Sequence, residues 1–172
     1  MFKKTVFLVF FFLINTNAYS IEGVAIVDVD YLLNKSKAGL FIQKKIQDQN
    51  KKLDDNFKKK EKELKDKENE ILSQKNILSE SDFKKKVSVL KKEISNYKLD
   101  KNKKIQSLAK KRNVAISKLL KNINKLLIDY SEESNISLIM DKKNIIITKN
   151  KNDITKKIFD KLNKEVTKIK FE

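Results

Sequence analysis

The side chains that most often perform catalysis are missing from this sequence. It contains neither histidine nor cysteine, which removes the usual general base, the thiol nucleophile and two common metal ligands. The chain also has no glycine-rich phosphate loop, and its carboxylates do not cluster with a partner residue. Asp28 and Asp30 are better explained as helix caps than as catalytic acids. We therefore expect a binding protein without a cofactor or a metal ion, and not an enzyme.

Lysine supplies most of the remaining chemistry. The 172 residues include 40 Lys+Arg against 23 Asp+Glu, a formal charge of +17. Such a charge attracts anionic partners, which include lipid head groups, acidic proteins and nucleic acid. Part of the excess is consistent with coding bias in an A+T-rich genome, because Asn and Ile are abundant as well. The run Lys84, Lys85 and Lys86 is a candidate basic surface, although such a run is more often only a solvated face.

The first 20 residues have the layout of a secretory signal peptide. Lys3 and Lys4 precede the apolar residues 6–14 (VFLVFFFLI), and small residues follow at Ala18 and Ser20. Cleavage after Ser20 is expected, and cleavage after Ala18 also fits. The apolar stretch is too short for a membrane-spanning helix, which needs about 20 residues. Export makes nucleic acid the least expected partner, and the lack of cysteine leaves packing or assembly to stabilise the exported chain.

Residues 40–133 carry the periodicity of two long helices. From 40 to 78 there is no Gly or Pro, and apolar residues recur at intervals of four and seven. Ser79 can cap a second helix with Asp82 at the reciprocal position. From 83 to 130 the apolar spacing alternates between three and four, with two stutters centred on Lys101 and Arg112. At 1.5 Å per residue, the helices would span about 58 Å and about 78 Å. This pattern predicts an antiparallel coiled-coil hairpin that projects from a smaller body.

The apolar residues of the hairpin are expected to form its own seam, with contact to a bound partner as a secondary role. The candidates for such contact are Phe57, Leu64, Leu90, Ile94 and Tyr97. Lys101 and Arg112 occupy seam positions as well. They indicate either flexible points or interhelical ion pairs with acidic residues of the first helix, and both alternatives remain open.

The flanking residues, 21–39 and 134–172, are expected to form the body. Residues 23–29, 136–140 and 145–148 are strand-like, with a four-residue hairpin loop at 141–144. A helix should begin near Asp153, and a short helical turn at 30–36 should end at Gly39. The predicted strands are apolar on both faces, so they need cover. Assembly of identical chains would supply it. The alternative is a monomer whose last helix caps the sheet.

The order of these elements resembles the Skp (OmpH-like) family of periplasmic chaperones. Three segments carry the resemblance, namely VAIVDVDYLLNKSKAG at 24–39, LSESDFKKKVSVLKKEI at 78–94 and SLIMDKKNIIITKNKNDIT at 137–155. The resemblance implies an α+β, predominantly α, fold in which each chain of a homotrimer gives three strands to a small β-barrel body. The residues that would form this trimerisation body are Val24, Ile26, Ile136, Leu138, Met140, Ile145, Ile146 and Ile147.

The resemblance also implies a function. Members of this family hold unfolded outer-membrane proteins in a cavity between helical arms, without ATP, and prevent their aggregation in the periplasm. Some associate with anionic lipid or lipopolysaccharide. The near-absence of arginine departs from the family pattern and puts any arginine-specific contact in doubt. The alternatives are a structural coiled-coil adaptor and an envelope protein that binds anionic lipid.

Overall fold

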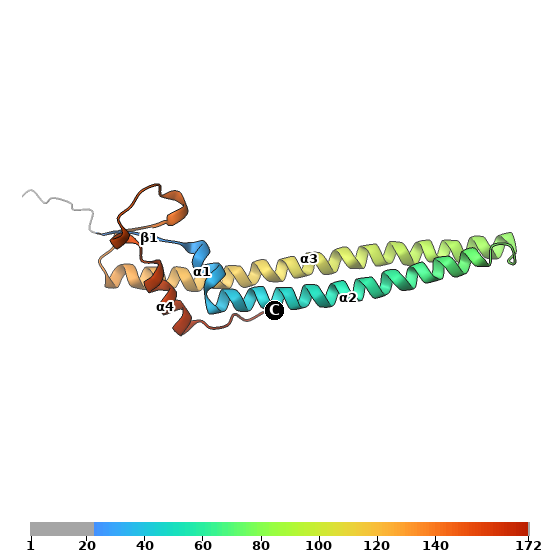
Figure 1. Ribbon diagram of the computed structural model, residues 1–172, viewed down its shortest axis with the longest axis horizontal. Coiled ribbons are helices and arrows are strands. Elements are labelled where there is room, and N and C mark those ends of the chain that lie inside the picture. Colours follow the sequence, from blue (N-terminus) through green and yellow to red (C-terminus); the bar gives the residue numbers. More distant parts are fainter. Residues whose placement is uncertain (1–22, 172) are drawn as a thin grey trace, which may run out of the picture.

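Two long antiparallel helices dominate the computed structural model, which describes residues 23–171 (Figure 1). Helix α2 spans Lys37–Ser73 and helix α3 spans Glu80–Glu133, with 37 and 54 residues. Their lengths are therefore about 55 Å and about 81 Å. The expected helical hairpin is confirmed, and we call α2, α3 and their connection the arm. The predicted signal peptide, residues 1–20, lies outside the described residues.

The tip of the arm is a short turn between α2 and α3. Helix α2 ends at Ser73, five residues before the predicted end at 78, because the reversal uses residues 74–79. Ser79 caps α3 as predicted. Its Oγ accepts a hydrogen bond from the Asp82 backbone N–H at 3.1 Å and donates one to the Asp82 carboxylate at 2.7 Å. The first turn of α3 thus begins with a satisfied backbone donor.

The base of the arm is fixed by a sharp joint between α1 (Val29–Lys35) and α2. The Asp28 carboxylate accepts from the Tyr31 backbone N–H at 2.7 Å and caps α1. The buried Ser36 ends α1 and caps α2 by accepting from the Gly39 N–H. The prediction that Gly39 ends the short helical turn at 30–36 is wrong. Gly39 lies in the first turn of α2, where a Cβ would be 1.9 Å from the Leu33 carbonyl oxygen.

The sheet in the described part has two strands, β1 (Val24–Val27) and β2 (Leu138–Asp141). They pair in parallel, with Val24 opposite Leu138, and the whole arm forms the crossover between them. On its other side β1 meets the segment before α4, where the Ile154 N–H donates to the Ile26 carbonyl at 2.9 Å.

The predicted strand at 145–148 and its hairpin loop are wrong for the single chain. After β2 the chain enters the short 3-10 helix η1 (Lys142–Asn144), and residues 145–148 continue without strand pairing. A strand needs a neighbour for its backbone N–H and C=O groups. The turn of η1 follows β2 directly, and among residues 23–171 the segment 145–148 pairs with no strand. Ile136 also precedes β2 instead of lying within it.

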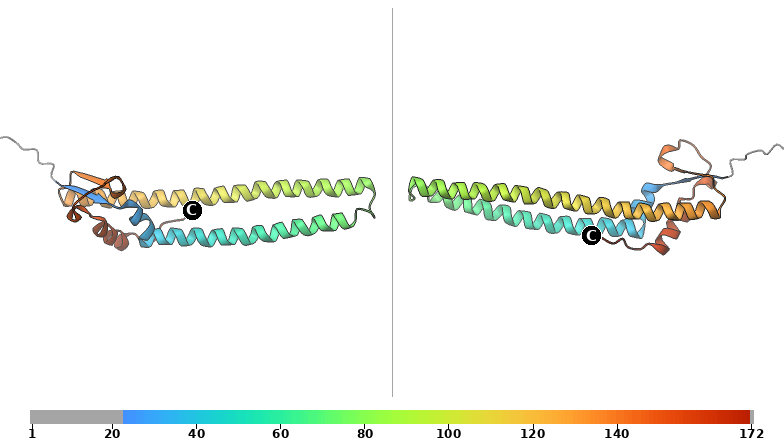
Figure 2. Two further views of the ribbon diagram at one scale, coloured as in Figure 1. Left: turned by 45° about the horizontal axis from the view of Figure 1, so that its top comes forward. Right: turned by 180° about the vertical axis from the view of Figure 1, so that it is seen from behind.

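The core of the body joins β1, α1, the end of α3 and α4 (Thr155–Glu165). Figure 2 shows β1, the last turns of α3 and α4 gathered at the same end of the arm. Leu32, Ile123, Ile158 and Leu162 are completely buried there. The helix expected near Asp153 is confirmed, with the Asp153 carboxylate accepting from the Thr155 N–H. The short 3-10 helix η2 (Asn150–Asn152) precedes α4. After α4 the chain runs back along the base of the arm, and Ile169 is buried there.

Candidate functional site

The body exposes apolar side chains that a stable monomer would normally cover. Ile146 and Ile147 have exposed fractions of 98% and 88%, and Leu138 and Ile128 are about half exposed. A shallow groove of about 330 Å³ runs between the end of α3 and β2, and Ile128 and Leu138 are among the residues that line it. We call Ile128, Leu138, Ile146 and Ile147 the apolar edge. Large apolar side chains that are exposed to this extent are typical of interaction sites.

The structure divides the eight residues predicted for the trimerisation body. Ile26 is buried inside the chain, and Val24, Ile136, Met140 and Ile145 are half-buried. Leu138, Ile146 and Ile147 are exposed, so only these three lie on the apolar edge. Ile128 was not predicted as a site residue, although the consecutive apolar residues at 126–128 of the second helix were a signal for it.

The residues predicted to contact a bound partner lie mainly inside the arm. Phe57, Leu64 and Leu90 are buried between α2 and α3, and Ile94 and Tyr97 are half-buried. Exposed apolar residues of α3 were not predicted as contacts. Besides Ile128 at the body, they are Val89, Leu99, Ile105 and Val114.

A compact polar and aromatic cluster joins the two helices in the middle of the arm. Lys101 Nζ lies 2.7 Å from Glu61 Oε1 and 5.1 Å from the centre of the Phe57 ring. The Tyr97 hydroxyl donates to the same Glu61 oxygen at 2.7 Å. The hydrogen bond from Lys101, followed by that from Tyr97, lowers the pKa of Glu61, and the bond to Glu61 raises the pKa of Lys101. We call Phe57, Glu61, Tyr97 and Lys101 the mid-arm cluster.

The mid-arm cluster resolves one of the two alternatives for the seam lysine and arginine. Lys101 forms an interhelical ion pair with an acidic residue of α2, as one alternative held. Arg112 does not, because no ion pair in the described part of the chain includes it. Lys67 and Glu93 form a second interhelical pair nearer the tip, at 2.6 Å.

The lysines near the tip are exposed but locally compensated. Lys84 lies 2.6 Å from Glu80, and Lys85 lies 3.9 Å from Asp82. Lys86 donates to the Gln74 side-chain oxygen at 2.6 Å. The two carboxylates offset part of the positive charge of this candidate basic surface.

Within residues 23–171 no group of three acidic, histidine or cysteine side chains is placed to hold a metal ion. No helix in the same range has the length and apolar character that a bilayer crossing requires.

Comparison with known proteins agrees with the fold. The model of the family described as Outer membrane protein (OmpH-like) matches residues 23–162. No curated protein matches the chain. A crystal structure of an OmpH-like protein from Caulobacter crescentus CB15, whose proposed role is that of an outer membrane chaperone, superposes with a TM-score of 0.82. The alignment covers 89% of this chain and 90% of that chain at 12% sequence identity, so the similarity concerns the fold alone. The family match covers most of the chain and confirms the resemblance found in the sequence: this protein belongs to the OmpH-like family.

Proposed function

We infer that this protein is an ATP-independent holding chaperone of the periplasm, which binds unfolded outer-membrane proteins and prevents their aggregation in transit. The observation that carries this inference is the combination of a long two-helix arm with a small body that exposes the apolar edge. Membership in the OmpH-like family supports it, as does the proposed chaperone role of the Caulobacter relative. In this proposal residues 1–20 are removed on export.

The functional unit in this proposal is a homotrimer. Residues 21–39 and 134–172 form its shared body, and residues 40–133 form one arm of each chain. The exposed side chains of Ile146 and Ile147 support an interface at the apolar edge. In the assembly, residues 145–148 would find the strand neighbour that the single chain lacks, and a barrel of three strands per chain could close.

Clients would be held by many weak apolar contacts. Leu99 and Ile105 are about half exposed on α3, and the candidates Ile94 and Tyr97 are half-buried beside them. Burial of one large apolar side chain contributes about 1.5 to 3 kcal/mol, so a few simultaneous contacts would hold a client reversibly. Phe57, Leu64 and Leu90 would become available only where α2 and α3 separate. Several arms in one assembly raise the effective concentration of all these contacts.

The positive charge would add attraction to acidic clients and to anionic lipid or lipopolysaccharide surfaces, over about 8 Å at physiological salt. Lys84, Lys85 and Lys86 at the tip are the candidate basic surface for such contact. Their pairing with Glu80, Asp82 and Gln74 indicates a modest contribution from these three lysines.

An aggregation assay tests the proposal. An unfolded β-barrel membrane protein is diluted from denaturant, without nucleotide, in the presence of the purified chain, and light scattering is recorded. Suppression of scattering at an equimolar amount of trimer is expected. Undiminished scattering, together with stoichiometric capture of one folded partner, would instead identify a coiled-coil adaptor.

A further inference from the structure

The single arginine of the chain lies in a cleft at the base of the arm. Arg112 is the one arginine among 40 basic residues, so the general abundance of lysine does not account for it. The cleft has a volume of about 560 Å³ and lies between α1, α2 and α3. This volume is within the range of about 300 to 1,000 Å³ that is usual for ligand pockets.

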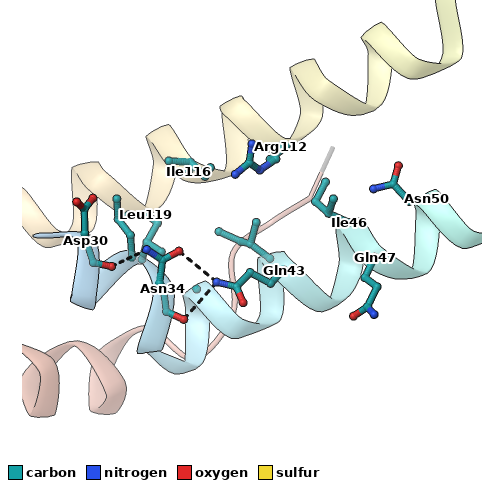
Figure 3. Close-up of a pocket in the computed structure, with 12 residues that line it drawn as sticks. Asp30, Asn34, Gln43, Ile46, Gln47, Asn50, Arg112, Ile116 and Leu119 are labelled. Atoms are coloured by element: carbon teal, nitrogen blue, oxygen red, sulfur yellow. Dashed lines mark hydrogen bonds between the residues drawn. The ribbon is translucent and has the colours of Figure 1, made fainter. Parts of the chain in front are cut away.

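The walls of the cleft combine apolar and carboxamide side chains. Figure 3 shows Arg112 and Ile116 on the edge of α3 that faces α2, opposite Ile46 and Asn50. Ile42 and Leu119 complete the apolar floor and are buried. The other wall residues with polar side chains are Asp30, Asn34, Gln43, Gln47 and Asn50.

Several of these polar groups are not used by the chain itself. Within residues 23–171, Arg112 has no carboxylate within ion-pair distance, although Lys67 and Lys101 on the same arm are both paired with acidic residues. The Asn50 side chain likewise has no hydrogen-bond partner in this range. Gln43 donates to the backbone and side-chain oxygens of Asn34, which fixes the α1 end of the cleft. The Arg112 guanidinium and the Asn50 carboxamide therefore remain available at the end of the cleft away from α1.

The chemistry of the available groups specifies the ligand. A guanidinium presents parallel N–H donors that match the two oxygens of a carboxylate. Carboxamides both donate and accept hydrogen bonds, which suits the N–H and C=O groups of an extended backbone. The floor of Ile42, Ile46 and Leu119 suits an apolar side chain. A doubly charged phosphate monoester has no hydrogen to donate to the carboxamide oxygens of the cleft. The Asp30 carboxylate in the same cleft would also repel it.

We propose that this cleft binds a short extended segment of an unfolded polypeptide in which an Asp or Glu is adjacent to an apolar residue. The carboxylate pairs with Arg112, the apolar side chain packs between Ile46 and Ile116, and Asn50 bonds the backbone. Asp30 at the opposite end orients the segment with its acidic residue toward Arg112. This inference rests on the proposed chaperone function and assigns to each chain a binding site of its own, separate from any cavity between arms.

Peptide binding to the full chain tests the site. A labelled, unstructured peptide of alternating Leu and Glu is compared with its Leu and Gln counterpart by fluorescence anisotropy. The wild-type chain should bind the Glu peptide about tenfold more tightly, as expected for a charge-assisted pair. Arg112→Gln should abolish this preference. Arg112→Lys, which keeps the charge and loses the fork, should weaken binding of the Glu peptide about fivefold. Equal binding of the two peptides by the wild type would overturn the proposal.

The matched control is Lys110→Gln on the same helix, which removes the same charge outside the cleft and should leave both affinities unchanged. An equal loss in Lys110→Gln and Arg112→Gln would overturn the proposal, because it would show an effect of net charge. Retention on anionic vesicles that depends on Arg112, with no peptide preference, would also overturn it in favour of a lipid head group. The aggregation assay separates the two inferences. If the wild type suppresses aggregation while both peptides bind equally, the site is wrong and the chaperone function stands.

Discussion

Lys101 Nζ lies 2.7 Å from Glu61 Oε1, so one ion pair joins α3 to α2 in the middle of the arm. Lys101 also lies over the Phe57 and Tyr97 rings, at 5.1 and 5.9 Å from their centres. The pair occurs at a stutter, where the apolar spacing of α3 departs from alternating steps of three and four. The mid-arm cluster therefore takes the place of an apolar contact where the apolar spacing of the coiled coil is interrupted.

The Glu61 carboxylate should make the stability of the arm dependent on pH. Its pKa is lowered below the ordinary value of 4.5 by the bonds from Lys101 and Tyr97. Its stabilising effect is therefore complete above that ordinary value and is lost as the pH falls through the lower pKa of the folded arm. Thermal unfolding followed by circular dichroism should give a higher melting temperature for the wild type than for Glu61→Gln at neutral pH. The difference should be small, because both side chains are partly exposed, and should vanish in acid.

Glu68→Gln on the same helix is the control for that measurement, since Glu68 forms no ion pair in the described part of the chain. A difference between wild type and Glu61→Gln that persists unchanged into acid would contradict the assignment of the effect to this carboxylate.

Adjacent residues Leu90 and Val89 should respond differently to truncation. Leu90 is 8% exposed in the seam, whereas Val89 is 59% exposed. Leu90→Ala should lower the free energy of unfolding of the arm by about 2 to 3 kcal/mol, because it removes packed methyl groups. Val89→Ala should change it by less than about 0.5 kcal/mol. Urea unfolding measures both values, and equal losses would contradict the observed seam.

Gly39→Ala should loosen the joint between α1 and α2. The added Cβ would meet the Leu33 carbonyl oxygen at 1.9 Å, and backbone cannot move away as a flexible side chain can. A loss of about 1 to 3 kcal/mol in the free energy of unfolding is expected. Leu40→Ala, at a half-exposed neighbour, should have a much smaller effect. Hydrogen exchange at the base of the arm would locate the change, and wild-type protection in Gly39→Ala would show that the joint tolerates a side chain.

Ile146→Asp should dissociate the proposed trimer. The side chain is 98% exposed in the single chain, so the substitution should not disturb the fold of one chain, whereas an interface would have to bury an unpaired charge. Light scattering should give the mass of a single chain. Ile77→Asp at the tip is the control, because Ile77 is also highly exposed at 82% but lies far from the apolar edge. A trimer mass that survives Ile146→Asp would exclude this residue from the interface.

Local patterns in the sequence were sufficient to predict the arm and its caps. The spacing of apolar residues in α2 and α3, the absence of Gly and Pro from residues 40–133, and Ser79 at the start of α3 each act within a few residues of the chain. The sequence allowed an interhelical ion pair at Lys101 but could not distinguish it from a flexible point, because the partner Glu61 lies on another helix.

The sequence by itself determined the two helices, their seam and the family resemblance, since backbone propensity and side-chain periodicity are local properties. The tertiary structure alone decided the parallel pairing of Val24 with Leu138, the place of Gly39 in α2 and the loss of the strand at 145–148. It also decided which basic residues are paired, with Lys101 bound to Glu61 and Arg112 left facing a cleft. These features depend on partners that are distant in the sequence. A strand or a charge has a defined state only when the group beside it in space is known.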